Sequence, residues 1–152
     1  MSIRNFAIVV AAAALTLPAS SGCNSVTTLL SGNVVTVEVV NDTPFDVDPR
    51  LVTSEESGFF GGLFGNDSDL ATGIVAPGDA ISLDLDCDSF ATIFCDAAEQ
   101  LDGNDLVGAV QPTKRFEIDQ DFECGDVIRF RFVGSESSFG VQVSVNGAIV
   151  PD

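Results

Sequence analysis

The amino-acid sequence predicts an all-β fold, an antiparallel β-sandwich of immunoglobulin-like or jelly-roll type with about eight strands. Apolar and polar residues alternate in short blocks from Val34 to Val150, which is the period of strands with one buried face. Gly, Pro, Asn and Asp separate these blocks at short intervals, as turns between neighbouring strands require. No block has a convincing helical period. A small barrel is the alternative architecture.

Four strands are expected in the first half of the folded region. The first begins near Asn33 and ends at a turn over residues 41–44. In the second, Pro49 favours a position at a sheet edge, because proline cannot donate a ladder hydrogen bond. The fourth has the clearest alternation, with a core face formed by Ile81, Leu83, Leu85 and Cys87. The second, third and fourth strands cover residues 45–53, 70–76 and 80–88.

The second half contains further short strands and one ambiguous segment. Residues 90–101 satisfy both the helical and the strand period over too short a window, so a helical turn and a strand both remain open. Asn146-Gly147 is the signal of a type I′ turn and predicts a hairpin. The other expected strands are residues 106–110, 113–118, 126–133, 138–145 and 148–150.

The first 23 residues carry the features of an export signal. Arg4 precedes an apolar run, residues 6–17, which is too short to span a bilayer. Small residues follow, and Ser20-Ser21-Gly22-Cys23 resembles the lipobox of bacterial lipoproteins. This resemblance implies that Cys23 becomes the lipid-modified first residue of the mature protein. Ser20 stands where a lipobox usually has Leu, so conventional cleavage near residues 19–21 and an uncleaved anchor are the alternatives.

These features divide the chain into a signal peptide (1–22), a lipidated cysteine with a tether (23–32) and a β-sandwich domain (33–152). The expected location is the bacterial cell envelope, with the exported protein lipid-anchored to a membrane, at the outer membrane or cell surface. Secretion into the medium is the expectation if the signal is cleaved conventionally.

The composition excludes several classes of function. The formal net charge is −17, and the residues after the signal hold 23 acidic and 5 basic side chains. Such a charge repels nucleic acid and anionic lipid headgroups, and it suits a saline exterior or cationic ligands. The chain has no His, which removes Ser-His and Cys-His nucleophile pairs and most zinc sites. No nucleophile-elbow, phosphate-loop or CxxC motif is present, so no enzyme activity is expected.

The cysteines predict one disulfide. With Cys23 lipidated, an odd count of three thiols remains for an oxidising compartment. Cys87 and Cys124 both lie on expected core faces near strand ends, where an inter-sheet bridge would close a loop of about 36 residues and add about 3–4 kcal/mol. Cys95 would then be a lone buried thiol or form an intermolecular bridge.

Acidic clusters in expected turns are candidate calcium ligands, because hard cations prefer several carboxylate and carbonyl oxygens. The alternative for each cluster is a solvated acidic surface. The candidate metal-ligating residues are Asp102, Asn104 and Asp105 in one turn and Asp119, Asp121 and Glu123 in another; Asn66, Asp67 and Asp69 form a third cluster.

One loop and one strand are candidate interaction surfaces. Residues 57–69 mix four Gly with an apolar tip, Phe59, Phe60, Leu63 and Phe64, which would either plug the core or contact a protein or membrane. On the strand 126–133, Arg129 and Arg131 face outward. They would pair with Asp84, Asp86 and Asp88 of a neighbouring strand or receive an anionic partner.

Taken together, the sequence predicts a non-enzymatic, lipid-anchored cell-envelope protein that acts as a structural or interaction module. Its expected partners are the membrane, through the lipid, and an envelope protein; nucleic acid is not expected. The alternative is a calcium-dependent binding domain of an exported protein. No cofactor is expected apart from calcium in that alternative.

Overall fold

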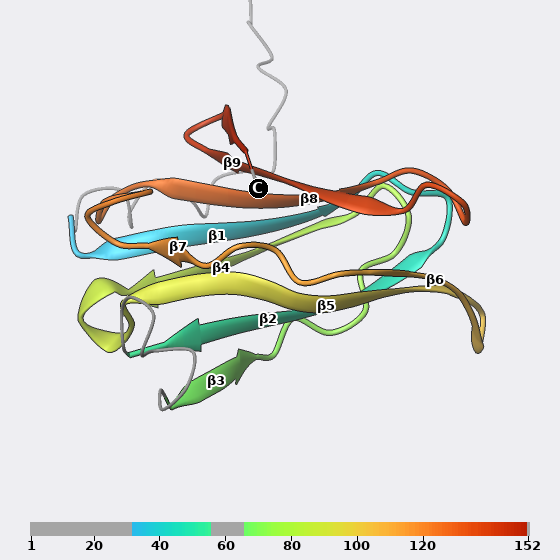
Figure 1. The fold of residues 1–152 in the computed structure, drawn as a ribbon, viewed down its shortest axis with the longest axis horizontal. Helices are drawn as coiled ribbons and strands as arrows, with labels where there is room; N and C mark the ends of the chain where they lie inside the picture. Colours follow the sequence, from blue (N-terminus) through green and yellow to red (C-terminus); the bar gives the residue numbers. More distant parts are fainter. Residues whose placement is uncertain (1–31, 56–65, 152) are drawn as a thin grey trace, which may run out of the picture.

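The computed structural model describes residues 32–55 and 66–151 and folds them into two stacked β-sheets (Figure 1). One sheet has the strand order β10-β9-β8-β1-β4, and the other has the order β3-β2-β5-β6, with β7 paired to β5 beside this path. The all-β sandwich prediction is confirmed, with ten strands in the described residues where about eight were expected. The strands are β1 (Val34–Asn41), β2 (Asp46–Ser54), β3 (Asp67–Leu70), β4 (Ala80–Asp86), β5 (Thr92–Asp102), β6 (Asp105–Val110), β7 (Phe116–Glu117), β8 (Val127–Val133), β9 (Gly140–Val145) and β10 (Ala148–Val150).

The core lies between the sheets and follows the predicted alternation. Val35, Val37 and Val39 of β1 are fully buried and meet the aromatic side chains of β8. The ring of Phe130 packs edge to face against Phe116, with centroids 6.3 Å apart. Burying one face of each strand in this way is the main stabilising contribution to a two-layer fold.

Three buried residues of the described part of the chain, Ser54, Thr92 and Gln100, have side-chain polar atoms without a hydrogen-bond partner, and Gln100 has two such atoms. Gln100 of β5 is fully buried, and neither its amide nitrogen nor its oxygen is bonded. It lies between Val47 of β2 and Gly108 of β6. The Gln100 Oε1 atom stands 2.9 Å from where a Cβ at residue 108 would lie, so the glycine makes room for the amide.

The sheet that contains β1 is not wholly antiparallel. β1 pairs antiparallel with β4, placing Val37 opposite Leu83, and parallel with β8, placing Val37 opposite Ile128. A parallel pair needs a long crossover connection. Here the chain passes through β2 and β5, the central strands of the other sheet, before it returns as β8. Alternation along single strands carries no information on this choice.

β2 is an interior strand, so the expectation that Pro49 marks a sheet edge is wrong. β3 pairs only with residues 51–54 of β2, and Pro49 lies beyond the end of that ladder. The Pro49 carbonyl accepts a hydrogen bond from Thr72 Oγ1 on the β3 side. The backbone nitrogen of Pro49 faces the same side as its carbonyl, away from β5. No ladder hydrogen bond is needed on that side, so the lack of an N–H costs nothing there.

Several expected boundaries also change. The ambiguous segment 90–101 is the strand β5, and the Asn146-Gly147 turn into β10 is confirmed. The expected strand 70–76 is wrong, because β3 ends at Leu70 and only Val75 makes a bridge to β2. The expected strand 113–118 shrinks to the two residues of β7.

The Cys87–Cys124 disulfide is confirmed, with Cα atoms 6.0 Å apart. It does not join the two sheets as expected. Cys87 lies buried just after β4 in a single 3₁₀ turn, and Cys124 lies exposed in the turn before β8, so the bond crosses the start of β1 within one sheet. Cys95 is buried in β5 outside this disulfide, and its thiol donates to the Ala97 carbonyl at 3.2 Å.

The two arginines of β8 pair with a different strand from the one expected. Arg129 Nη2 lies 2.6 Å from Glu38 Oε2, and Arg131 pairs with Asp42. Both acidic residues belong to β1 or the residue after it, which lies between β8 and β4. The expected pairing with Asp84 and its neighbours is therefore wrong, although a cross-strand charge pair does form.

Candidate functional site

Two of the predicted functional elements lie outside the described residues. These are Cys23 and the apolar loop tip Phe59, Phe60, Leu63 and Phe64. The strands that flank the loop are described, and Ser54 at the end of β2 stands opposite Asp67 at the start of β3. No helix among residues 32–55 and 66–151 is long and apolar enough to cross a membrane.

The predicted calcium ligands are only partly brought together. Asp102 and Asp105 face each other at the β5–β6 turn that contains Asn104, while Asp119, Asp121 and Glu123 lie in the turn after β7. In that second turn, one oxygen of Asp121 accepts from the Glu117 N–H at 2.9 Å and the other contacts Lys114 Nζ at 3.1 Å. Within the described ranges, no three His, Cys, Asp or Glu side chains form a group that could hold a metal ion.

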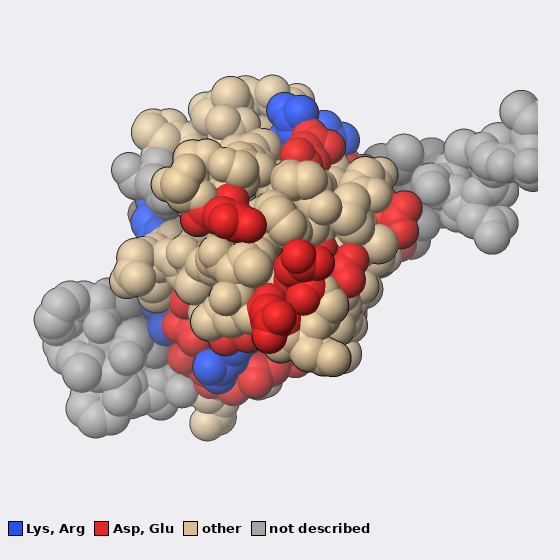
Figure 2. All heavy atoms as spheres, turned by 90° about the vertical axis from the view of Figure 1, so that its right-hand side faces the viewer, with Lys and Arg blue, Asp and Glu red and all other residues tan. Residues whose placement is uncertain are grey.

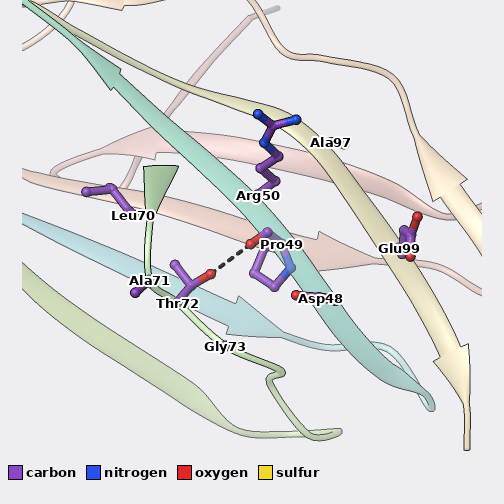
Figure 3. A pocket seen from close by; sticks show the side chains of 9 residues that line it. All are labelled: Asp48, Pro49, Arg50, Leu70, Ala71, Thr72, Gly73, Ala97 and Glu99. Carbon is purple, nitrogen blue, oxygen red and sulfur yellow. Dashed lines mark hydrogen bonds between the residues drawn. The ribbon is translucent and has the colours of Figure 1, made fainter. Parts of the chain in front are cut away.

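A groove of about 430 Å³ lies on the outer face of the second sheet (Figure 3). Residues 48–50 of β2 form its floor, residues 70–73 after β3 form one wall, and Ala97 and Glu99 of β5 line the other side. It therefore combines small apolar surfaces with three charged side chains.

The groove exists because the segment after β3 is one residue longer than the strand beside it. Leu70 stands opposite Leu51, and Val75 bridges Val47. Residues 71–74 therefore span the same distance as residues 48–50, so the longer segment bows outward. Gly73 has φ +67°, a left-handed conformation that glycine adopts at little cost, and the Thr72–Pro49 hydrogen bond of 2.7 Å fixes the wall.

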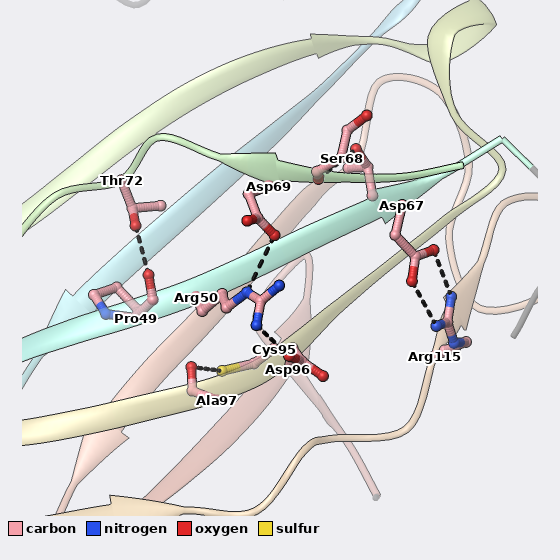
Figure 4. A network of polar contacts seen from close by, with 11 residues as sticks. Pro49, Arg50, Asp67, Ser68, Asp69, Thr72, Cys95, Asp96, Ala97 and Arg115 are labelled. Carbon is pink, nitrogen blue, oxygen red and sulfur yellow. Dashed lines mark hydrogen bonds and ion pairs between the residues drawn. The ribbon is translucent and has the colours of Figure 1, made fainter. Parts of the chain in front are cut away.

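Arg50 projects from β2 into this groove and is already neutralised. Its Nε lies 3.2 Å from Asp69 Oδ1, and its Nη1 lies 3.2 Å from Asp96 Oδ2 (Figure 4). The Arg50 side chain is 58% exposed, so these are surface ion pairs of modest strength. They fix the direction of the guanidinium on the outer face.

Asp48 and Glu99 form a second feature of the groove. They stand directly opposite each other on β2 and β5, and both are exposed. The Cβ atoms of two directly opposed residues are about 5 Å apart, and like charges in this arrangement are destabilising. Neither carboxylate has an ion-pair partner among the residues that the structure describes.

Beyond Arg50, the outer face continues as a packed polar and aromatic surface. Arg115 pairs with Asp67 at 3.3 Å (Figure 4). The Arg115 guanidinium also lies 3.9 Å from the centre of the Phe94 ring. Phe94 and its cross-strand neighbour Val52 are 5% and 2% exposed. Sequence reasoning missed this surface, because Phe94 falls in the segment whose period was ambiguous.

The surface as a whole is acidic. All five cations after the signal form ion pairs: Arg50, Lys114, Arg115, Arg129 and Arg131. Figure 2 shows one end of the molecule, where red Asp and Glu atoms are spread over the face and cover more of it than the blue Lys and Arg atoms. Uncompensated charge on this surface is negative.

No family model and no curated protein sequence matches the chain. Among solved structures, the chain is similar to pneumolysin (8% identity, TM-score 0.47, covering 74% of this chain and 24% of that one). It is also similar to the membrane-binding domain of pneumolysin (7%, TM-score 0.46, covering 73% and 96%) and to suilysin from Streptococcus suis (5%, TM-score 0.44, covering 74% and 23%). The chain spans about a quarter of the full-length toxins. No functional conclusion follows from likeness at this level.

Proposed function

We propose that this protein is an exported, non-enzymatic interaction module, anchored to the bacterial cell envelope by lipid on Cys23. In this proposal the binding surface is the outer face of the sheet that contains β2 and β5. The observation that carries it is the groove: an open depression with apolar walls and charged side chains on the outer face of a two-layer fold.

Export is supported by the disulfide. The Cys87–Cys124 bond is typical of proteins that fold in an oxidising compartment, since cytosolic thiols are kept reduced. The signal-like segment that ends at Cys23 agrees with this address. Lipid on Cys23 would place the sandwich close to the membrane, because β1 begins only eleven positions later, at Val34.

A binding role is favoured over catalysis by the exposure of the groove. Its charged side chains remain in water, with Arg50, Asp69 and Asp96 showing side-chain exposures of 58%, 61% and 38%. Catalytic sites gain most of their electrostatic effect by excluding water. An open charged surface with apolar walls is better suited to holding part of another molecule.

The anchor is tested by expressing the whole protein in a bacterium and separating membranes from soluble fractions. The wild type is expected in the membrane fraction with an acylated N-terminal peptide in its mass spectrum. Cys23→Ser is expected to lose both. Cys95→Ser serves as the matched control and should stay at the membrane. An unmodified wild-type Cys23, or a Cys23→Ser variant that remains bound, would rule out the lipid anchor.

A further inference from the structure

We propose that the groove beside Asp48 and Glu99 holds a Lys or Arg side chain of a partner protein. This inference rests on the proposed function as an interaction module and specifies the chemistry of the partner.

The charge balance of the groove is negative. Arg50 is committed to Asp69 and Asp96, both at 3.2 Å. Asp48 and Glu99 are left facing each other across β2 and β5 without a cation between them. A cation placed between these carboxylates would remove their repulsion and donate charge-assisted hydrogen bonds to both of them.

That cation has to come from another molecule. Every Lys and Arg after the signal is already in an ion pair. Three of the five lie on other parts of the molecule: Lys114 with Asp121, Arg129 with Glu38, and Arg131 with Asp42. A second copy of the chain would bring the same committed cations and the same excess of carboxylates, so self-association does not supply the missing charge.

The shape of the groove selects a long basic side chain over a bare ion. Its volume of about 430 Å³ lies within the range of small-ligand sites. Two opposed carboxylates also fall short of the six to eight oxygens, roughly, that calcium takes. Pro49 gives the groove an apolar floor, and Leu70 and Ala97 give it apolar walls. The methylene stem of Lys or Arg packs on such surfaces while its charged end reaches the carboxylates.

The test measures binding of a fluorescein-labelled peptide of alternating Lys and Val to the exported protein in neutral detergent. Anisotropy gives Kd for the wild type and for the double variant Asp48→Asn/Glu99→Gln. The matched control is Asp102→Asn/Asp105→Asn, which removes an equally opposed acidic pair at the β5–β6 turn. The same peptide with Glu in place of Lys reports binding that does not need positive charge.

The groove variant is expected to weaken binding about tenfold, the loss that corresponds to one good charge-assisted contact. The control variant should change Kd by much less, because long-range attraction to the whole acidic surface is screened by salt. Equal weakening in both variants would refute the groove, as would spermidine or calcium binding there while the peptide does not. The anchor experiment on Cys23 is independent, so either part of the proposal can fail alone.

Discussion

Replacing the buried Gln100 by methionine is expected to stabilise the sandwich. The Gln100 side chain is fully buried, and neither of its amide atoms has a partner in the described residues. Burying an unbonded amide costs about 1–3 kcal/mol. Methionine has a similar length and no group that needs a hydrogen bond, so it fills the same space against Gly108 without that cost.

The expected gain is about 1–2 kcal/mol, because a small misfit of the thioether offsets part of the recovered free energy. For a domain of this size, that corresponds to a rise in melting temperature of about 3–8 °C. Urea denaturation of wild type and Gln100→Met, with fluorescence of an extrinsic probe or circular dichroism as the signal, measures the change. Gln142→Met on the exposed face of β9 is the matched control and should be nearly neutral.

A loss of stability in Gln100→Met with an unchanged urea slope would refute the reasoning. It would mean that the amide is satisfied in solution and holds β5 in register with β2 and β6. A second variant, Gln100→Glu, checks that position 100 is buried in solution, since a buried carboxylate should destabilise by several kcal/mol, roughly, in either case.

Four further predictions follow from the fold. Gly134→Ala should destabilise by more than about 2 kcal/mol, since φ is +105° and the added Cβ would lie 2.2 Å from the Ser138 carbonyl oxygen; Gly140→Ala, with open space, is the control in urea melts. Removing the disulfide with Cys87→Ala/Cys124→Ala should cost about 2–5 kcal/mol by the same assay, and a negligible loss would show that the bond contributes nothing. Raising salt from millimolar to molar should increase the melting temperature by several degrees, because repulsion among the surplus carboxylates is screened; a fall would contradict this. Millimolar calcium should leave the melting temperature unchanged, and a rise that a chelator reverses would instead establish the calcium-dependent alternative.

Strand faces were predictable from the sequence because each requires only the local alternation of side chains. Val35, Val37 and Val39 alternate with polar neighbours, and the structure buries all three. The Cys87–Cys124 pair was predictable from the position of both residues close to strand ends, although Cys124 is exposed in a turn and does not lie on a core face as expected. Asn146-Gly147 carries its own turn signal and needs no tertiary information.

Features that depend on which strands are neighbours were not predictable. The partners of Arg129 and Arg131 follow from the insertion of β1 between β8 and β4, and nothing in either strand specifies that order. The groove depends on one surplus residue in the segment 71–74 relative to residues 48–50. The opposition of Asp48 to Glu99 requires the register of β2 with β5.

The position of the disulfide has a mechanical consequence for a tethered protein. The Cys87 N–H donates to the Asn33 carbonyl at 3.0 Å, and the Gly125 N–H donates to the Val34 carbonyl at 2.8 Å. Cys87 itself and the residue after Cys124 are therefore hydrogen-bonded to the chain where it enters β1. If the protein is held at Cys23, any pull from the membrane arrives at this point and runs along β1. The hydrogen bonds to β4 and β8 are then loaded together in shear, and the disulfide keeps those two strands from parting to release the strand between them.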